Sequence, residues 1–247
     1  MPRKSTPARP AVSLSRARTF RRKLLAWYDR AGRDLPWRRT RDPYHVLVSE
    51  VMLQQTQVSR VAEYFPRFLA RFPDLGTLAR AKQRSVLEAW EGLGYYARAR
   101  NLHALARAVT RELDGALPSD PIALERLPGI GRYTAGAVAS FAYERPVPAV
   151  DTNVARVIRR AFLEDVSGAS ARSPRMVWQL AASLVPRDGK RAWKFNQAIM
   201  ELGALLCVAR RPRCPQCPVR GQCRTGTTEL APQRGGRGHS ERPRRGG

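Results

Sequence analysis

Four cysteines near the C-terminal end form the group of side chains best suited to bind a metal centre. Cys207, Cys214, Cys217 and Cys223 follow the pattern C-x6-C-x2-C-x5-C within 17 residues. Such a local arrangement fits a metal site better than disulfides, which are rare in a reducing cytosol. Zinc commonly binds two separated C-x2-C pairs, whereas here one close pair is flanked by two single cysteines. The asymmetry favours an iron-sulfur cluster, with zinc as the competing occupant.

Glu50 is a carboxyl group in apolar surroundings. It is the only acid in the run VLVSEVML at 46–53, which has the composition of a buried helix. Burial disfavours the charged form of a carboxyl group and so raises its pKa. Glu50 is therefore a candidate proton donor, although a glutamate that faces solvent or closes a helix cap would fit the same pattern.

Asp151 is a second carboxyl group, at the start of an expected helix in the segment VPAVDTNVARVIRR. A helix N-terminus favours the ionised form, which is the state that stabilises a cationic sugar. A simple N-cap is the alternative for Asp151, and Asn153 shares that ambiguity. Cleavage of an N-glycosidic bond needs a proton for the leaving base and a negative group near the oxocarbenium ion. Glu50 and Asp151 can fill these two roles.

A glycine-rich hairpin, LPGIGRYT at 127–134, precedes the second carboxyl group in the chain. Pro128 favours a turn there, and Gly129 and Gly131 permit tight backbone geometry before a helix that begins near Tyr133. Exposed amides at a helix N-terminus can hold a phosphate group without reading base sequence. An ordinary turn between two helices would have a similar sequence.

The elements that must position these residues are predicted to be helices. Apolar residues recur at helical spacing from Phe20 to Val109, and strand-like alternation is scarce. Proline and glycine between these segments divide the chain into helices of roughly 8 to 15 residues. The sequence therefore predicts an all-α fold, with disordered basic tails at 1–13 and 226–247.

The charge of the chain indicates a polyanionic partner. Its 247 residues include 45 Lys and Arg against 20 Asp and Glu, a net charge of +25. Nucleic acid is the expected partner, with a ribosomal or membrane-surface protein as the alternative class. No apolar run is long enough for a transmembrane helix or a secretory signal, which predicts a cytoplasmic protein. An organelle transit peptide is the alternative for the Arg-rich start.

Taken together, these motifs resemble the adenine DNA glycosylase family of the helix-hairpin-helix superfamily. The resemblance runs from about Leu35 to Cys223. Its segments are LPWR, SEVMLQQTQV, GLGYYARARNLH, LPGIGRYTAGAV, VDTNV, FNQAIMELGALLC and the cysteine loop. It implies excision, from double-stranded DNA, of an adenine that is paired with 8-oxoguanine or guanine and flipped into a cleft.

The resemblance also implies a two-lobed fold with a [4Fe-4S] cluster. A six-helix barrel module with the hairpin would occupy 37–140, and a cluster module would combine 14–36 with 141–225. A monomer is expected. The cluster would be held by the four cysteines, as the sequence pattern itself favours.

Individual roles follow from the resemblance for residues that match the family's motifs. Glu50 matches the general acid, and Asp151 the carboxylate that stabilises or bonds to the sugar. Tyr133 and Asn153 match positions that support this intermediate. The expected contacts to substrate or DNA are made by Arg38 to the flipped adenine, Gln55 and Tyr95 as wedges in the base stack, and Leu127, Gly129 and Gly131 in the hairpin.

Three features qualify the resemblance. Bifunctional relatives carry a Schiff-base lysine after the hairpin, whereas this chain reads G-R-Y-T, so a monofunctional enzyme is expected. Full adenine glycosylases continue into a Nudix-like domain that reads 8-oxoguanine, and this sequence stops before it. The alternatives are a thymine or uracil mismatch glycosylase and a cluster-containing DNA-binding protein with an inert pocket. LQQTQV and GLGYYARARNLH favour adenine.

Overall fold

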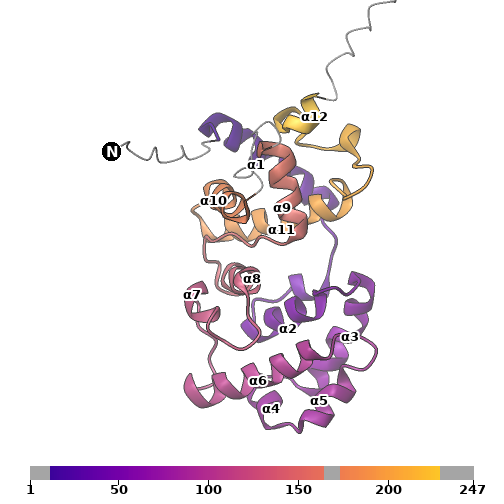
Figure 1. The fold of residues 1–247 in the computed structure, drawn as a ribbon, viewed down its shortest axis with the longest axis vertical. Helices are drawn as coiled ribbons and strands as arrows, with labels where there is room; N and C mark the ends of the chain where they lie inside the picture. Colours follow the sequence, from indigo (N-terminus) through magenta and orange to yellow (C-terminus); the bar gives the residue numbers. More distant parts are fainter. Residues whose placement is uncertain (1–11, 164–172, 229–247) are drawn as a thin grey trace, which may run out of the picture.

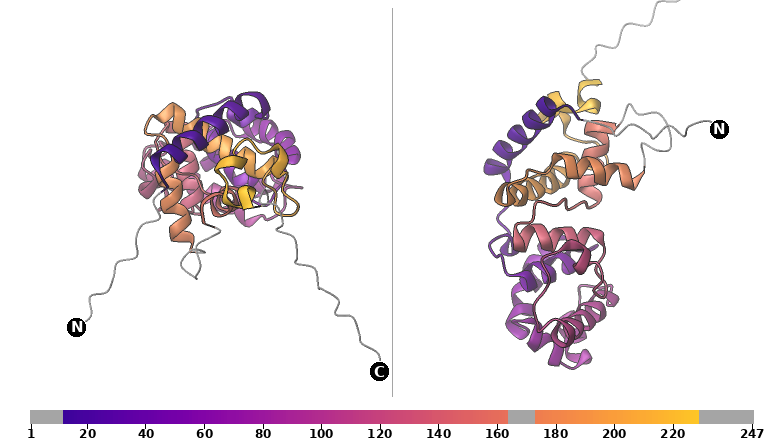
Figure 2. Two further views of the ribbon diagram at one scale, coloured as in Figure 1. Left: turned by 90° about the horizontal axis from the view of Figure 1, so that it is seen from above. Right: turned by 90° about the vertical axis from the view of Figure 1, so that its left-hand side faces the viewer.

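The computed structural model describes residues 12–163 and 173–228, and every regular element in these two ranges is helical. The expected all-α fold is confirmed. The helices lie in two lobes stacked along the long axis of the molecule (Figures 1 and 2). Within the described ranges, no helix is both long and apolar enough to cross a membrane.

The first lobe contains the helices from the middle of the chain. They are α2 (Pro43–Leu53), α3 (Val58–Arg71), α4 (Leu75–Arg80), α5 (Gln83–Ala89), α6 (Ala97–Glu112), α7 (Pro121–Leu124) and α8 (Arg132–Tyr143), with the short 3-10 turn η1 (Pro36–Arg38). Helix α2 packs against both α3 and α8, and α4 packs against α6. The buried side chains of this lobe form one continuous core.

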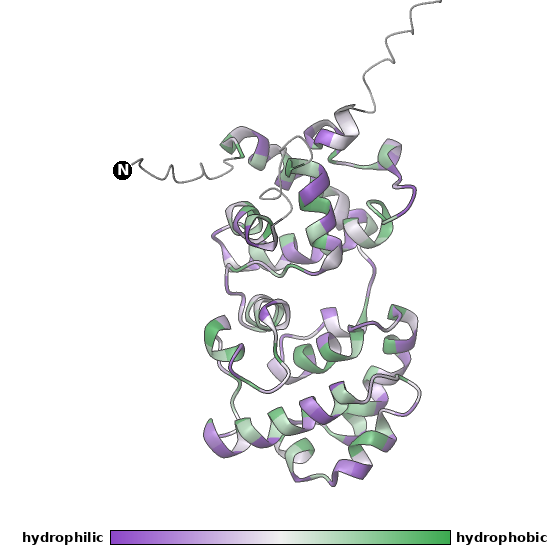
Figure 3. Ribbon diagram, viewed as in Figure 1, coloured by the Kyte–Doolittle hydropathy of each residue, from purple (hydrophilic) through white to green (hydrophobic). Residues whose placement is uncertain are grey.

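The second lobe joins the N-terminal helix to the last third of the described chain. Its elements are α1 (Leu14–Ala31), α9 (Thr152–Ile158), the π-helical turn η2 (Arg159–Leu163), α10 (Pro174–Leu184), α11 (Gly189–Leu205), the 3-10 turns η4 (Cys214–Gln216) and η5 (Arg220–Gln222), and α12 (Arg224–Thr228). These elements share a second core, in which α1 and α9 both pack against α11. Apolar segments occur along the helices of both lobes (Figure 3).

The helix boundaries follow from capping residues and proline. Asp42 accepts hydrogen bonds from the amides of Tyr44 and His45, and Pro43 occupies the first position of α2. Asp120 with Pro121 begins α7 in the same way. The helices vary more in length than the sequence predicted, from the 4 residues of α7 to the 18 of α1. In proteins most of the stability of a helix comes from tertiary packing and not from its local signals, so these signals predict its length poorly.

Three expected boundaries need correction. Phe141 and Ala149 belong to the first core, so that core continues past residue 140, to about residue 149. Ser13, expected in the N-terminal tail, accepts a hydrogen bond from the Arg16 amide and caps α1. Residues 226–228, expected in the C-terminal tail, belong to α12. Val12, also expected in the N-terminal tail, is partly buried against the second core. Residues 1–11 and 229–247 of the expected tails lie outside the described residues.

Polar side chains in the interior join the two lobes. The Asn196 amide on α11 donates to Ser140 Oγ at 2.8 Å and to the Val147 carbonyl at 2.9 Å. Its Oδ1 accepts a bond from the Ala149 amide at 3.4 Å. Buried polar groups in proteins are nearly always hydrogen-bonded. Through these three hydrogen bonds, Asn196 fixes the segment that runs from α8 toward α9.

Candidate active site

A cleft of about 920 Å³ receives side chains from both lobes. From the first lobe it is lined by Trp37, Arg38, Glu50, Gln55 and Tyr133. From the second lobe it is lined by Asp151, Asn153, Trp178, Gln197 and Glu201. The fold thus brings together both carboxyl groups singled out in the sequence, although they lie about a hundred positions apart in the chain.

Glu50 lies in α2 with only 4% of its surface exposed. The Tyr133 hydroxyl donates a hydrogen bond to Glu50 Oε2 at 2.5 Å. Burial raises the pKa of Glu50 to about 7, and the nearby Asp151 adds to the rise. The Tyr133 bond and the Arg38 charge oppose it. The raised pKa agrees with the expectation from the apolar sequence, and the carboxyl group can give up a proton near neutral pH.

Tyr133 stands in the first turn of α8, immediately after the hairpin. Burial raises the pKa of its phenol well above the ordinary value, and the neighbouring Glu50 adds to this rise. The phenol therefore stays protonated and acts as a donor toward Glu50.

Asp151 is the N-cap of α9. Its Oδ1 accepts a hydrogen bond from the Val154 amide at 2.7 Å, and its Oδ2 accepts one from Asn153 Nδ2 at 2.8 Å. Burial raises the pKa of Asp151, while these hydrogen bonds oppose the rise. The expected effect of the helix N-terminus is thus present but is outweighed by burial. Of the two carboxyl groups, Glu50 has the larger rise in pKa.

Asn153 is held in one orientation by its neighbours. Its Oδ1 accepts a hydrogen bond from Arg156 Nη2 at 2.7 Å, which leaves its Nδ2 for Asp151. Gly203 on α11 lets this segment approach closely, because a Cβ at that position would lie 2.7 Å from the Asn153 Cβ. The amide of Asn153 therefore fixes the Asp151 carboxyl group rather than reaching across the cleft.

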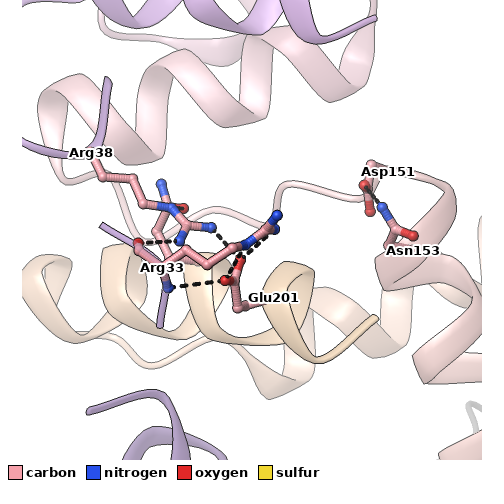
Figure 4. A network of polar contacts seen from close by, with 6 residues as sticks. Arg33, Arg38, Asp151, Asn153 and Glu201 are labelled. Atoms are coloured by element: carbon pink, nitrogen blue, oxygen red, sulfur yellow. Dashed lines mark hydrogen bonds and ion pairs between the residues drawn. The ribbon is translucent and has the colours of Figure 1, made fainter. Parts of the chain in front are cut away.

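Arg38 is part of a buried ionic network (Figure 4). Its Nη2 donates to Glu201 Oε2 at 2.7 Å, and its Nε donates to Gln197 Oε1 at 2.9 Å. Arg33 Nε donates to the other Glu201 oxygen at 2.7 Å. Burial works to raise the pKa of Glu201, but the hydrogen bonds from the two arginines outweigh it, and the pKa is lowered.

Glu201 and Gln197 are site residues to which the sequence analysis assigned no role. Glu201 is the only acid in α11 and follows the apolar run AIM, which is the same signal that identified Glu50. Its partners could not be foreseen, because Arg38 lies 163 positions away in the chain.

Gln55 and Tyr95, the expected wedge residues, lie in two loops of the first lobe, after α2 and before α6. Both have left-handed backbone conformations, with φ of 57° at Gln55 and 48° at Tyr95. Gln55 lines the cleft, whereas Tyr95 does not and is 62% exposed. Their exposure leaves both side chains available to a partner.

The hairpin connects α7 to α8. Leu127 is half-buried, whereas Gly129 and Gly131 are exposed. Gly129 has a φ of 75°, and a Cβ there would lie 2.7 Å from the Asn101 Cβ, so the turn requires glycine. Gly131 is the N-cap of α8 and provides no side-chain cap. The first amides of α8 are therefore presented at the hairpin, as phosphate binding requires.

The four cysteines lie in the irregular segment after α11. Cys214 begins η4, Cys217 follows it, and the Cys217 amide bonds to the Cys214 carbonyl at 3.1 Å. Burial raises the pKa of Cys217 to about 11, and the thiols of the other three cysteines add to the rise. The other three thiols therefore all lie near that of Cys217. In the described ranges, no three His, Cys, Asp or Glu side chains are arranged to hold a metal ion.

Comparisons with known proteins agree with this geometry. Residues 48–186 match the family described as HhH-GPD superfamily base excision DNA repair protein. The adenine DNA glycosylase of Rattus norvegicus is 47% identical over 83% of this chain and 41% of its own length. That of Mycolicibacterium smegmatis is 48% identical over 81% of this chain and 67% of its own length. The chain thus spans about two fifths of the rat relative.

Solved structures show the same architecture. A thermostable thymine-DNA glycosylase superposes with a TM-score of 0.79 and 30% identity, over 87% of this chain and 98% of that one. Endonuclease III in a trapped covalent intermediate with DNA has a TM-score of 0.74 and 25% identity, over 89% of this chain and 100% of that one. With the family match, this similarity shows that the chain belongs to the HhH-GPD superfamily of base excision DNA repair proteins.

Proposed function

We propose that the protein is a monofunctional adenine DNA glycosylase that removes adenine paired with 8-oxoguanine or guanine in double-stranded DNA. One observation supports the chemistry above all others. Glu50, with a pKa of about 7, and Asp151, held by the Val154 amide and the Asn153 side chain, line the same cleft. The similarity to adenine DNA glycosylases, at 47% and 48% identity, supports adenine as the base.

In the proposed reaction, protonated Glu50 transfers its proton to a ring nitrogen of the flipped adenine. The bond between the sugar C1′ and the base then breaks, and its electron pair leaves with the adenine. Asp151 stabilises the resulting oxocarbenium ion, or bonds to it, until water adds at C1′ and loses a proton. The products are free adenine and an abasic site, and the strand stays intact.

The remaining cleft residues are assigned supporting roles. Tyr133 orients Glu50 through their hydrogen bond, and Asn153 orients Asp151. Arg38 would contact the flipped adenine with the N–H groups that its network leaves unused. Gln55 and Tyr95 would enter the base stack, and Leu127, Gly129 and Gly131 would present the hairpin to a phosphate group.

The absence of strand cleavage is part of the proposal. An imine route needs a lysine in the cleft, and none of the described side chains that line the cleft is a lysine. We therefore expect the DNA strand to remain uncut until the abasic site is treated with hot alkali.

The first test uses duplexes that contain A:8-oxoguanine, A:G or T:G. Each duplex is incubated with the protein, and one half of the sample is then heated in alkali. We expect alkali-dependent cleavage at adenine and little at thymine. Loss of thymine alone would support a thymine mismatch glycosylase, since the superposed thermostable structure is a thymine-DNA glycosylase. Binding without cleavage on all three duplexes would support a DNA-binding protein without activity.

A [4Fe-4S] cluster held by Cys207, Cys214, Cys217 and Cys223 is the second part of the proposal. Four half-buried cysteines, three of them near the Cys217 thiol, are a donor set that suits iron-sulfur chemistry. When bound, such a cluster supplies a cross-link for the segment after α11 and can accept electrons. Brown protein with broad visible absorption and about four irons per chain is expected. Colourless protein with stoichiometric zinc would contradict the assignment.

A monomeric state and a cytoplasmic location stay predictions from the sequence. Size-exclusion chromatography with light scattering would test the first. Because most contacts to DNA should be made to phosphates, we also expect affinity to fall steeply as salt rises.

A further inference from the structure

Arg98 is a buried arginine at the second position of α6, with 8% of its surface exposed. Its Nη1 lies at the C-terminal end of α2, the helix that carries Glu50. There it donates to the carbonyl oxygens of Val51 at 3.0 Å, Met52 at 2.8 Å and Gln54 at 2.5 Å. One nitrogen thus binds the carbonyl groups with which α2 ends.

The second terminal nitrogen of Arg98 faces a different segment. Its Nη2 donates to the carbonyl oxygens of Leu93 at 3.1 Å and Gly94 at 3.0 Å, in the loop before α6. It also donates to Thr56 Oγ1 at 3.1 Å, in the loop after α2. A single planar guanidinium therefore cross-links two loops that are about forty residues apart in the chain.

The cross-link is made by a charge without an acidic partner. All six acceptors of the Arg98 side chain are carbonyl or hydroxyl oxygens, and within the described residues its Nε has no acceptor. Burial lowers the pKa of Arg98, as expected for a charge removed from water. The negative end of the α2 dipole offsets part of this cost. A buried charge without an acidic partner is expensive, so the place of Arg98 depends on these six oxygens at the end of α2 and in the two loops.

Each cross-linked loop carries one of the expected wedge residues. Gln55 directly follows Gln54, and Tyr95 directly follows Gly94. Both wedge residues have left-handed backbone conformations. Residues other than glycine adopt this conformation only when their surroundings hold them there. The Arg98 Cζ also lies 5.6 Å from the centre of the Tyr95 ring.

We propose that Arg98 is a positioning residue that holds Gln55 and Tyr95 together in the conformation that enters the DNA base stack. The inference rests on the proposed base excision function. It assigns Arg98 to the extrusion of the target base and not to the cleavage of the glycosidic bond, because Arg98 contacts the loops and neither carboxyl group.

Lysine cannot replace Arg98 in this role. A guanidinium presents a flat fork of donors that reaches both loops, whereas an ammonium group is a compact point charge with three donors. The variant Arg98→Lys therefore keeps the charge and loses the cross-link. Arg107→Lys, at an exposed position of the same helix, is the matched control.

The test measures extrusion separately from cleavage. A duplex with 2-aminopurine in place of the target adenine becomes fluorescent when that base unstacks. Single-turnover release of adenine is measured on the matching mispair. All proteins are compared at a temperature at which circular dichroism shows them fully folded. We expect Arg98→Lys to lower both the extrusion signal and the rate on the order of tenfold to a hundredfold. Arg107→Lys should change neither.

A mutant cycle shows whether Arg98 acts through the wedge residues. In a Gln55→Ala, Tyr95→Ala background, adding Arg98→Lys should cause little further loss, because the side chains it positions are gone. The milder Thr56→Val removes one of the six acceptors and should give a severalfold loss in the same direction, which keeps the test decisive if Arg98→Lys folds poorly.

Two results would overturn the inference. One is a normal extrusion signal in both Arg98→Lys and Thr56→Val. The other is a loss of the same size in the presence and absence of the two wedge side chains, which indicates a general structural role. Failure of the proposed function is distinguishable, since wild-type protein would then extrude 2-aminopurine without releasing adenine.

Discussion

Glu50 and Asp151 are both carboxyl groups on helices of the same cleft, but their surroundings differ. Glu50 lies in the interior of α2, within the first core, and receives one hydrogen bond, from Tyr133. Asp151 lies at the N-terminus of α9 and receives bonds from the Val154 amide and the Asn153 side chain. Burial acts on both, but only Asp151 has several donors that oppose it.

The difference separates the proposed roles of two chemically similar groups. A carboxyl with a pKa of about 7 is partly protonated at neutral pH and suits a proton donor. A carboxyl whose hydrogen bonds favour its charged form suits the stabilisation of a cation. The surroundings of each group, and not its type, therefore determine which step it can serve.

Glu50→Gln should have the largest effect, because it removes the transferable proton. We expect single-turnover release of adenine to fall on the order of a hundredfold to ten-thousandfold, with unchanged affinity for mispaired DNA by fluorescence anisotropy. Glu112→Gln, at an exposed position of α6, is the control and should retain activity. Normal turnover by Glu50→Gln would show that another group is the acid.

Asp151→Asn tests the other member of the pair. The amide keeps an oxygen for the Val154 bond but loses the negative charge, so we expect adenine release to fall on the order of a hundredfold to a thousandfold. Asp188→Asn makes the same change at the exposed N-cap of α11 and should leave the rate unchanged. If Asp151→Asn, like Asp188→Asn, lowers only the melting temperature and leaves the rate of adenine release unchanged, Asp151 is a simple N-cap.

The raised pKa of Glu50 should also appear in the stability of the fold. Its pKa is about 7 when folded against an ordinary value of 4.5, so the folded state holds more protons between these values. Stability is therefore lost as pH rises from about 4.5 to about 7, by about 3 kcal/mol. Glu50→Gln should raise the melting temperature above pH 7 and not below pH 4.5. An equal shift at both pH values would contradict the raised pKa.

Tyr133→Phe should have the smallest effect and sharpens the contrast between the two carboxyls. The Tyr133 bond lowers the pKa of Glu50, so its removal should move the alkaline limb of the pH-rate profile upward, on the order of one pH unit. The shift is measured from single-turnover rates in matched buffers. Tyr64→Phe, elsewhere in the first lobe, should not move the limb. A downward shift in Tyr133→Phe would show that the hydroxyl stabilises the protonated form instead.

The features that sequence could predict are local ones. A lone acid in an apolar run indicated the buried Glu50, and Asp before a helical segment indicated the Asp151 cap. Aspartate and proline pairs such as Asp42 with Pro43 marked helix starts. Each of these signals depends on neighbours within about four positions, where helical geometry fixes which groups can meet.

The features that sequence could not predict depend on contacts between distant segments. Arg38 meets Glu201 across 163 positions, and Asn196 draws the 147–149 segment to the first core. The first core therefore continues beyond the boundary expected at residue 140. The burial that raises the pKa of Asp151 likewise depends on the tertiary fold, which no local pattern records.

The pH dependence of adenine release by the wild-type protein is the most direct test of the central claim. Single-turnover rates on an A:8-oxoguanine duplex are measured from below to well above pH 7, with binding kept saturated at each pH. Because Glu50 must be protonated to act, the rate should fall about tenfold per pH unit above an apparent pKa of about 7. A rate that stays constant well above that pH would contradict the assignment of Glu50 as the acid.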